Sequence, residues 1–193
     1  RFVLLEAAGR EALEAELVRL QPAELLVDED TPAPAPWDAF GGLRRLPPWH
    51  FSRDTDLALL TEQLGTRDLA GFGCPPDHPA LGAAGCLLHY ARETQRAALP
   101  HLARLTVERQ DEAVLLDAAT RRNLELSHNL GGGTDNTLVA VLDHTATPMG
   151  SRLLRRWLQR PVRDRGEVTA RQDAVEALLE AGLHRDLQPL LRG

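Results

Sequence analysis

The chain of 193 residues contains no lysine, and all 22 of its basic residues are arginine. A Walker A loop follows the pattern G-x-x-x-x-G-K-[ST], in which the lysine ammonium reaches the outer phosphates of a nucleotide. The absence of lysine therefore excludes a Walker A ATP site from this sequence.

Cysteine is scarce, and long apolar runs are missing. The two cysteines, Cys74 and Cys86, fit a reducing compartment in which thiols stay free. No run of apolar residues approaches the roughly 20 that a membrane helix needs, and no secretory signal is present. We therefore expect a soluble, cytoplasmic protein with no membrane association.

Methionine occurs once, at Met149, and the chain opens with Arg1 directly before an apolar segment. A natural chain starts with methionine and rarely starts inside a strand. We therefore expect this sequence to be a fragment of a longer protein.

An excess of positive charge is also lacking. Residues 1–100 carry 9 arginines against 15 acidic residues, whereas residues 101–193 carry 13 of each. Neither half has the basic excess of an autonomous nucleic-acid-binding domain.

The first third has the pattern of an α/β unit. Residues 2–6 and 23–30 are short apolar runs typical of strands, and residues 10–20 between them have a helical pattern. The apolar stripe of this helix consists of Leu13, Leu17 and Leu20. A strand, a helix and a strand with short connections predict a right-handed crossover between parallel strands.

Proline and glycine predict a loop over residues 31–42. Residues 43–51 are compatible with a further strand, which Pro47 and Pro48 confine to the edge of a sheet. From Ser52 onward the pattern is helical. We therefore divide the chain into an α/β domain at residues 1–100 and a mainly α-helical domain at residues 101–193.

The second domain contains several helix-boundary signals. Thr147 followed by Pro148 is typical of a helix start, and a capping box begins at Asp164. Gly182 has the position of a residue that closes a helix. Strand-like runs are expected within residues 105–117, and a turn with a short helix within residues 117–126.

Three consecutive glycines in HNLGGGTDNT, residues 128–137, resemble a phosphate-binding loop. Their spacing does not fit a dinucleotide fingerprint, and no convincing strand precedes them. We interpret the segment as a flexible connection in which Asn136 or Thr137 caps the next short helix.

Two further groups suggest metal sites. Asp28, Glu29 and Asp30 follow an apolar strand, as do the carboxylates of magnesium-dependent nucleases with a ribonuclease H-like fold. A single acidic cluster is not a two-metal centre, and a solvated strand end explains it more simply. The four residues Cys74, His78, Cys86 and His89 suit zinc but match no common zinc module. We expect Cys86 to be a buried thiol.

Four arginines lie on one side of the helix that starts at Pro148. They are Arg152, Arg155, Arg156 and Arg160. Such a face can contact DNA phosphates, pair with carboxylates of a neighbouring domain, or stay solvated. An autonomous DNA-binding module thus remains an alternative. No serine, cysteine or histidine has the setting of a nucleophile, so we expect no catalysis.

Three longer segments closely resemble the MutS family of bacterial DNA mismatch repair proteins. They are GTRDLAGFG at residues 65–73, AAGCLLHYARETQRAALPHL at residues 83–102, and the block of nearly fifty residues from Leu116 to Arg165. The resemblance implies the later part of the connector, an α/β domain similar to ribonuclease H, followed by the start of the helical core with its levers.

The same resemblance implies a mechanical role. Members of the family recognise mismatched DNA, hydrolyse ATP with Mg²⁺, form homodimers and bind the partner MutL at the connector. No Phe-x-Glu mismatch wedge occurs here, since Phe2, Phe40, Phe51 and Phe72 all lack the glutamate. We expect this piece to couple ATP state to DNA grip without cofactors of its own, and to contact other domains of its own chain. The candidate MutL surface is the exposed side of the first helix, with Arg10, Glu14, Arg19 and Gln21.

Overall fold

The computed structural model describes residues 1–32, 37–96 and 98–192. It divides into two compact units, Arg1–Arg109 and Gln110–Gly193. The predicted boundary was residue 100. The first unit extends further because strand β4 (Leu105–Glu108) pairs with strand β1 (Phe2–Leu5) at its beginning.

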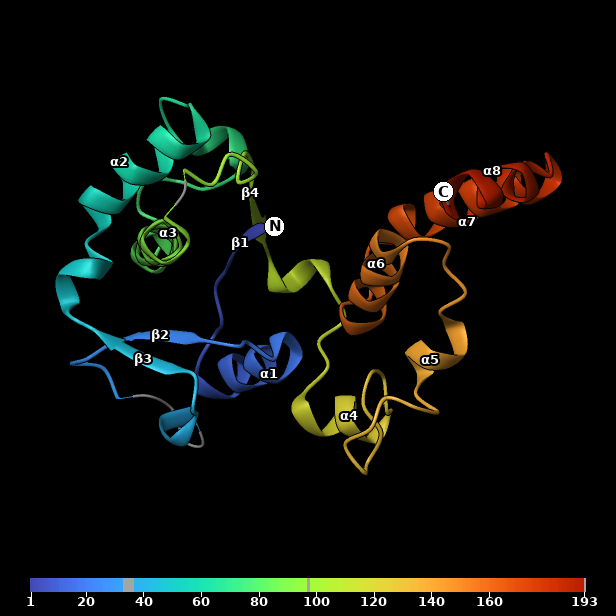
Figure 1. Ribbon diagram of the computed structural model, residues 1–193, viewed down its shortest axis with the longest axis horizontal. Coiled ribbons are helices and arrows are strands. Elements are labelled where there is room, and N and C mark those ends of the chain that lie inside the picture. The colour runs from blue at the N-terminus through green and yellow to red at the C-terminus, as the bar shows by residue number, and fades with distance from the viewer. Residues whose placement is uncertain (33–36, 97, 193) are drawn as a thin grey trace. The chain divides into compact units, whose positions relative to one another are not determined.

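The first unit contains two separate parallel strand pairs (Figure 1). Strand β1 pairs with β4, with Phe2 opposite Leu105, and β2 (Leu25–Asp28) pairs with β3 (Leu43–Leu46). The helix α1 (Arg10–Leu20) follows β1. The prediction of a β1–α1–β2 crossover within one sheet was therefore wrong, because β1 takes its partner from a strand about a hundred residues later.

Two further helices of the first unit both end at a residue in the left-handed conformation. Helix α2 (Arg53–Leu64) ends at Gly65, which has a positive φ of 64°, and α3 (Leu81–Gln95) ends at Arg96. Single 3-10 turns occur at η1 (Trp37–Ala39), η2 (Pro48–Phe51) and η3 (Ala70–Phe72). Residues 78–99 have a helical pattern in the sequence until Pro100, and helix α3 occupies only part of that span.

The core of the first unit lies between β1, β4, α2 and α3. Its largest fully buried members include Leu60, Leu81, Leu88 and Leu105. Helices α2 and α3 pack side by side (Figure 1). Gln63 of α2 donates to the carbonyls of Leu99 and Leu102 at 3.0 and 3.3 Å and accepts from Arg92 of α3 at 2.7 Å, so polar groups close one end of this pair.

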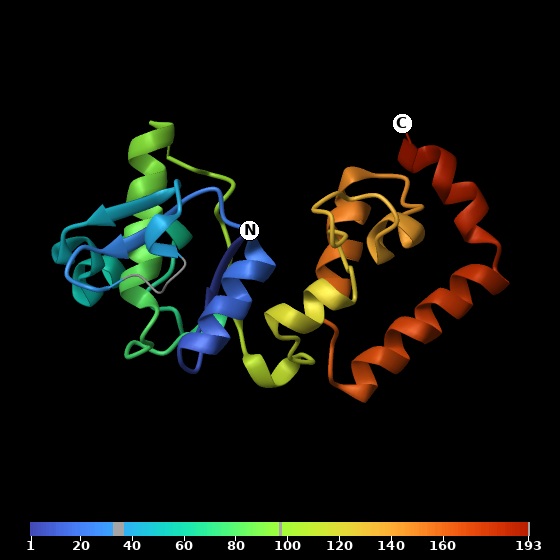
Figure 2. The same cartoon turned by 90° about the horizontal axis from the view of Figure 1, so that it is seen from below.

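The second unit is helical. Its elements are η4 (Gln110–Glu112), α4 (Ala118–Asn123), α5 (Leu138–Leu142), α6 (Pro148–Gln159), α7 (Arg165–Glu180) and α8 (Leu183–Arg192). Figure 2 shows that α7 and α8 extend away from the shorter helices α4 and α5. An α/β unit followed by a helical unit confirms the predicted fold class.

Local signals set most of these helix ends. Thr147 accepts from the Gly150 amide at 3.0 Å, Asp164 accepts from the Glu167 amide at 2.7 Å, and Gly182 takes a positive φ of 67° after α7. The segment within residues 113–117 forms no strand; Ala113 makes one isolated antiparallel bridge, with Val162. None of the described helices is both long enough and apolar enough to cross a bilayer.

Candidate functional surfaces

Helix α1 carries the candidate partner surface. Arg10 donates to Glu14 at 2.9 Å, an i,i+4 pair whose side chains are 63% and 34% exposed. Gln21 closes the helix in the left-handed conformation, with a φ of 45° and its amide bonded to the Leu17 carbonyl. Arg10, Glu14 and Gln21 therefore lie near the surface, as a partner-binding surface requires.

Arg19 requires a correction. Its side chain is only 8% exposed, and its Nη2 lies 2.6 Å from Glu16 and 3.6 Å from Glu108. The guanidinium turns toward β4 because a buried carboxylate lies there. Arg19 is therefore an internal ion-pair residue and contributes little to an exposed surface.

The apolar stripe of α1 is also less buried than its pattern predicts. Leu17 is buried, but Leu13 is 39% and Leu20 is 58% exposed. Val18 adds another exposed side chain at 39%. The visible surface of α1 thus combines charges with apolar groups, a composition that suits contact with another protein better than simple solvation.

The four arginines of the second unit do not form one equivalent set. Arg152, Arg155 and Arg156 are exposed on α6. Arg160 stands at the C-cap of the helix, where its side chain is 15% exposed and lies 3.9 Å from the Glu112 carboxylate. The pattern therefore overestimated the arginine face by one member, because the helix ends before Arg160.

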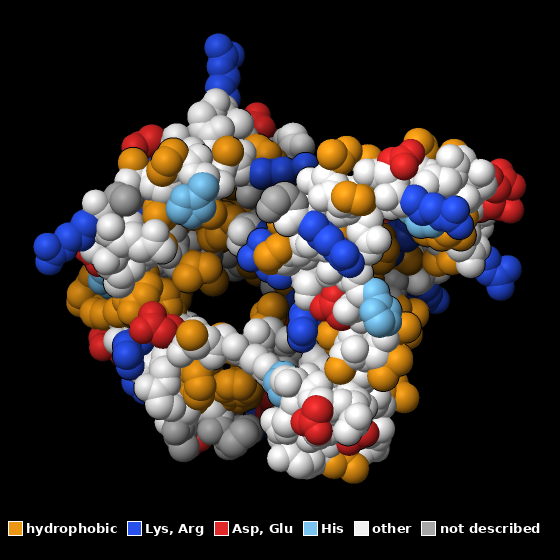
Figure 3. All heavy atoms as spheres, turned by 45° about the vertical axis from the view of Figure 1, so that its right-hand side comes forward, with side chains coloured by type: hydrophobic (Ala, Val, Ile, Leu, Met, Phe, Trp, Pro, Cys, Tyr) orange, Lys and Arg blue, Asp and Glu red, His pale blue; other side chains and the backbone are white. Residues whose placement is uncertain are grey.

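Exposed hydrophobic side chains accompany these arginines. Met149 is 74%, Leu153 is 37% and Trp157 is 39% exposed on the same helix. The Arg171 guanidinium of α7 stacks over the Trp157 ring at 4.3 Å and also pairs with Glu167. Figure 3 shows basic and hydrophobic side chains interspersed over the helical unit. Mixed surfaces of this kind are typical of protein contacts rather than of a phosphate-binding strip.

The glycine segment is an ordered loop, and its interpretation as a flexible connection needs correction. Asn129 organises it: its Oδ1 accepts from the Gly133 amide at 2.8 Å, and its Nδ2 donates to the carbonyl and the carboxylate of Asp135 at 3.1 and 3.2 Å. The Leu130 amide donates to Glu125 at 2.7 Å. The loop amides at Leu130 and Gly133 thus have internal acceptors, whereas a phosphate cradle presents its amides to the ligand.

The end of this loop begins the next helix. Thr137 is 1% exposed and accepts from the Ala140 amide at 3.2 Å. Its hydroxyl also donates to the Thr134 carbonyl at 3.0 Å. The predicted cap of α5 is confirmed at Thr137, and the loop serves to seat that helix.

The suggested metal sites find no support in the part of the chain that the structure describes. Asp28 accepts from the Asp30 amide at 2.9 Å, a local turn at the end of β2. Cys74 and Cys86 are free and buried, as predicted for Cys86. No group of three histidine, cysteine, aspartate or glutamate residues among the described residues is placed to hold a metal ion.

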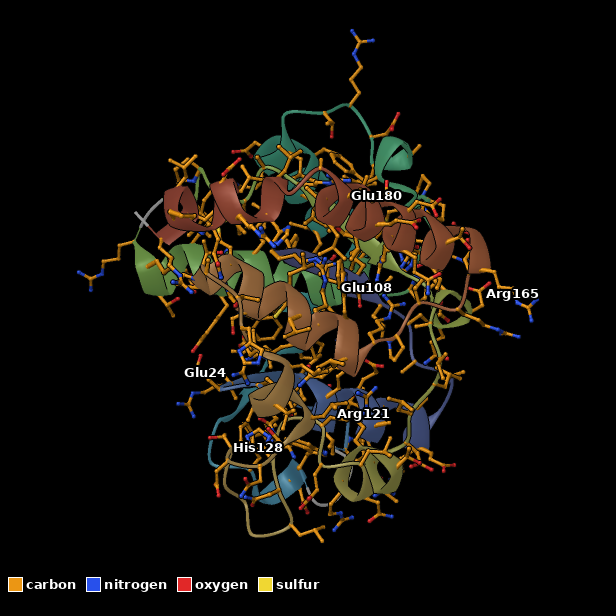
Figure 4. The ribbon with its side chains drawn as sticks, turned by 90° about the vertical axis from the view of Figure 1, so that its right-hand side faces the viewer. Glu24, Glu108, Arg121, His128, Arg165 and Glu180 are labelled. Carbon is orange, nitrogen blue, oxygen red and sulfur yellow. The ribbon has the colours of Figure 1, made fainter. Side chains whose placement is uncertain are left out.

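Two buried acidic residues escaped the sequence reasoning. Glu108 of β4 is 6% exposed and pairs with Arg1 at 2.8 Å, while Asp56 in the first turn of α2 is 5% exposed. The burial of these two residues could not be predicted from their sequence neighbours, because the elements that cover them are distant in sequence. Glu108 is labelled in Figure 4.

Comparison with protein-family models gives two matches in chain order. Residues 1–103 match MutS domain II, and residues 119–193 match MutS domain III. The first match covers more than half of the chain, coincides with most of the α/β unit, and the second falls within the helical unit. The chain therefore belongs to the MutS family, and comprises connector and core segments of a mismatch repair protein.

Proposed function

We propose that this chain transmits ATP-dependent conformational signals between the ATPase and DNA-binding parts of a MutS-type mismatch repair protein. The order of the two family matches, each within its own compact unit, carries this proposal. Transmission needs packed elements that move as units. Helix α7, with 16 residues, spans about 24 Å at 1.5 Å per residue and is suited to act as a lever.

The nucleotide chemistry belongs to another part of such a protein. The chain has no lysine for a Walker A loop, and no described side chains form a metal site. We therefore propose that this piece is not an enzyme, and that ATP and Mg²⁺ act on it indirectly. The test is a thermal melt of the 193-residue chain with and without ATP–Mg²⁺. We expect an unchanged Tm, since a ligand stabilises only what it binds; a concentration-dependent rise in Tm would overturn this assignment.

Recognition of mismatched DNA is proposed for the complete protein rather than for this piece. Fluorescence anisotropy with a labelled G·T duplex and the matching homoduplex tests the distinction. We expect no preference for the mismatch. A clear preference would favour the alternative of an autonomous DNA-binding module, and Arg152→Glu would then be the first variant to examine.

We also propose that the surface of α1 takes part in docking of MutL. Support comes from the exposed pair of Arg10 and Glu14 beside the exposed Leu13 and Leu20. The double variant Arg10→Glu/Glu14→Arg keeps an i,i+4 pair and places the acid nearer the helix N-terminus, which favours the helix. It therefore exchanges the positions of the two charges without changing the net charge or unfolding α1.

Binding of MutL to the immobilised chain is the readout. The charge swap should weaken binding at least tenfold. The matched control is Glu62→Arg on α2, whose side chain is 76% exposed, and it should bind as the parent does. Equal loss in both variants would show that the effect is not specific to α1. We also propose that the full protein is a homodimer. We further propose a cytoplasmic location, because the two free, buried thiols suit a reducing compartment.

A further inference from the structure

Asp56 is a buried carboxylate without a complete set of partners. It lies in the first turn of α2 and is 5% exposed. Its Oδ2 has no hydrogen-bond partner among the described residues. A buried carboxylate oxygen left in this state costs free energy, because it has lost water and gained no donor. The Oδ2 atom of Asp56 therefore lacks either a bound proton or a hydrogen-bond donor.

Helix α3 presents its backbone to this carboxyl. A Cβ atom at Gly85 would lie 2.1 Å from Asp56 Cβ and 2.4 Å from Oδ1, so glycine is what allows the approach. One turn earlier, a Cβ at Gly82 would lie 2.4 Å from the carbonyl oxygen of Phe51, the last residue of η2. The two glycines therefore seat η2 and the Asp56 carboxyl side by side on α3.

Three titratable groups face Asp56 from the elements packed around it. They are His50 of η2 together with Cys86 and His89 of α3. The imidazole rings of His50 and His89 lie 5.5 Å apart, and His89 Nε2 lies 3.2 Å from Glu93. Burial raises the pKa of Asp56 to about 6, and the two imidazoles oppose that rise. Burial and the charge of Asp56 raise the pKa of the Cys86 thiol to about 11.

We propose that Asp56, His50 and His89 form a single proton-binding site that fastens the η2 turn to helix α3. One proton taken from solvent completes the site. On a ring it creates a cation facing the carboxylate; on the carboxyl it removes the buried charge. Either placement relieves the same uncompensated anion at Asp56.

The η2 turn connects this site to the surface. The indole of Trp49 is 71% exposed, and its ring lies 6.2 Å from that of His50. Proton uptake at His50 or Asp56 thus acts on the turn that displays the most exposed large aromatic side chain of the first unit. The consequence is a surface indole whose surroundings change with pH near 6, where the Asp56 carboxyl exchanges its proton.

A metal ion is a poorer occupant of the same place. The described residues bring no three donor side chains together in a ligand geometry, although His50, His89 and Asp56 are near one another. His89 also directs its Nε2 toward Glu93. A proton, in contrast to a metal ion, does not need three donor side chains directed at one point.

NMR titration of the 193-residue chain from pH 8 to pH 5 tests the proposal. The observed nucleus is the indole N–H of Trp49. Asp56→Asn keeps the shape and removes the titrating carboxyl, so the chemical-shift transition of this N–H near pH 6 should disappear. Asp54→Asn, an exposed acid in the same helical turn, is the matched control and should leave the transition unchanged.

A second measurement needs no variant. The side-chain carboxyl carbon of Asp56 in the parent chain should titrate well above the ordinary aspartate range, and the Trp49 N–H should follow the same midpoint. A Trp49 N–H transition near pH 6 that persists in Asp56→Asn, or an Asp56 carbon that titrates as a solvated aspartate does, would overturn the proposal.

Discussion

Arg121 of α4 donates from Nη1 to the backbone carbonyl of Gln159 at 2.5 Å, and so closes the C-terminal end of α6. Its Nε donates to the Leu116 carbonyl at 3.1 Å (Figure 4). The final carbonyls of a helix have no partner within the helix and carry the negative end of its dipole. One guanidinium therefore joins the residues just before α4 to the end of α6.

Arg121→Ala should destabilise the second unit by about 1–3 kcal/mol, because it leaves the Gln159 carbonyl without its charged donor. Urea unfolding followed by circular dichroism measures the change. Its neighbour Arg122→Ala is the control: that side chain is exposed, and the variant should remain within about 0.5 kcal/mol of the parent. Equal losses in the two variants would contradict the role given to Arg121.

Glu108 supports a second prediction, in the first unit. It lies between Arg1 at 2.8 Å and Arg19 at 3.6 Å, and both Glu108 and Arg19 are nearly inaccessible. Removal of one member of a buried pair leaves the other charge uncompensated. In the variant, Arg19 keeps its pair with Glu16, and Arg1 is partly exposed. Glu108→Ala should therefore cost about 1–3 kcal/mol, the size of a lost buried polar partner.

The control for Glu108→Ala is Glu14→Ala, on the exposed side of α1. Surface pairs contribute about 0–1 kcal/mol, so this variant should unfold almost as the parent does. Arg19→Met/Glu108→Leu removes both charges and restores apolar contact; it should recover much of the stability lost in Glu108→Ala. Failure of the double variant to recover would mean that the hydrogen bonds of Arg19 matter more than its charge.

The contrast between these residues shows what the sequence alone could reveal. Thr137, Thr147 and Asp164 cap their helices as predicted, because each cap bonds an amide three residues away. The burial of Arg19 depends on Glu108, which follows 89 residues later. No local pattern contains that information.

The prediction of strand pairing failed for the same reason, because the partner of a strand can lie far away in the sequence. The apolar runs of β1 and β2 were recognised, but β1 pairs with β4 and β2 with β3. The choice of partner depends on which strands the core brings together. No helix was predicted after Gly182, although α8 has a helical stripe of leucines and contains Pro189. The stripe consists of Leu183, Leu187, Leu190 and Leu191.

The glycine loop gives a third prediction from a matched pair of variants. A Cβ at Gly133 would lie 2.6 Å from Asp135 Oδ1 and 3.1 Å from Asn129 Nδ2, whereas a Cβ at Gly131 meets only Asn129 Oδ1 at 3.4 Å. Gly133→Ala should destabilise the second unit by about 0.5–1.5 kcal/mol, because the new Cβ displaces the hydrogen-bonded side chains of Asn129 and Asp135. Gly131→Ala should change stability by less than about 0.5 kcal/mol.

Hydrogen exchange distinguishes this ordered loop from a flexible connection. The Gly133 amide donates to Asn129 and should be protected in the parent chain. Gly133→Ala and Asn129→Asp should both remove that protection, the latter because it sets a carboxylate against Asp135. Rapid exchange at Gly133 in the parent chain would contradict the ordered loop.

Asp143 gives a pH-dependent prediction for the junction of α5 and α6. Its carboxylate accepts hydrogen bonds from the Ser151 hydroxyl and from the Thr145 hydroxyl, the latter at 2.6 Å. These bonds, Ser151 foremost, lower the pKa of Asp143 below its usual value. A carboxylate whose pKa is lower in the folded state stabilises the protein above its unfolded pKa. That stabilisation is lost as the pH falls through the folded value.

Asp143→Asn should therefore lower the Tm at pH 7, where the bonds to the carboxylate are intact, and the difference from the parent should shrink as the pH falls below about 4, the ordinary aspartate range. Thermal melts from pH 7 to pH 3 provide the measurement. Asp173→Asn, at an exposed position on α7, supplies the control and should show no such narrowing. A Tm difference that stays constant across the whole pH range would mean that Asp143→Asn is destabilised for a reason other than charge. The hydrogen bonds from Ser151 and Thr145 are stronger when the Asp143 carboxylate is ionised, so a charge effect must vary with pH.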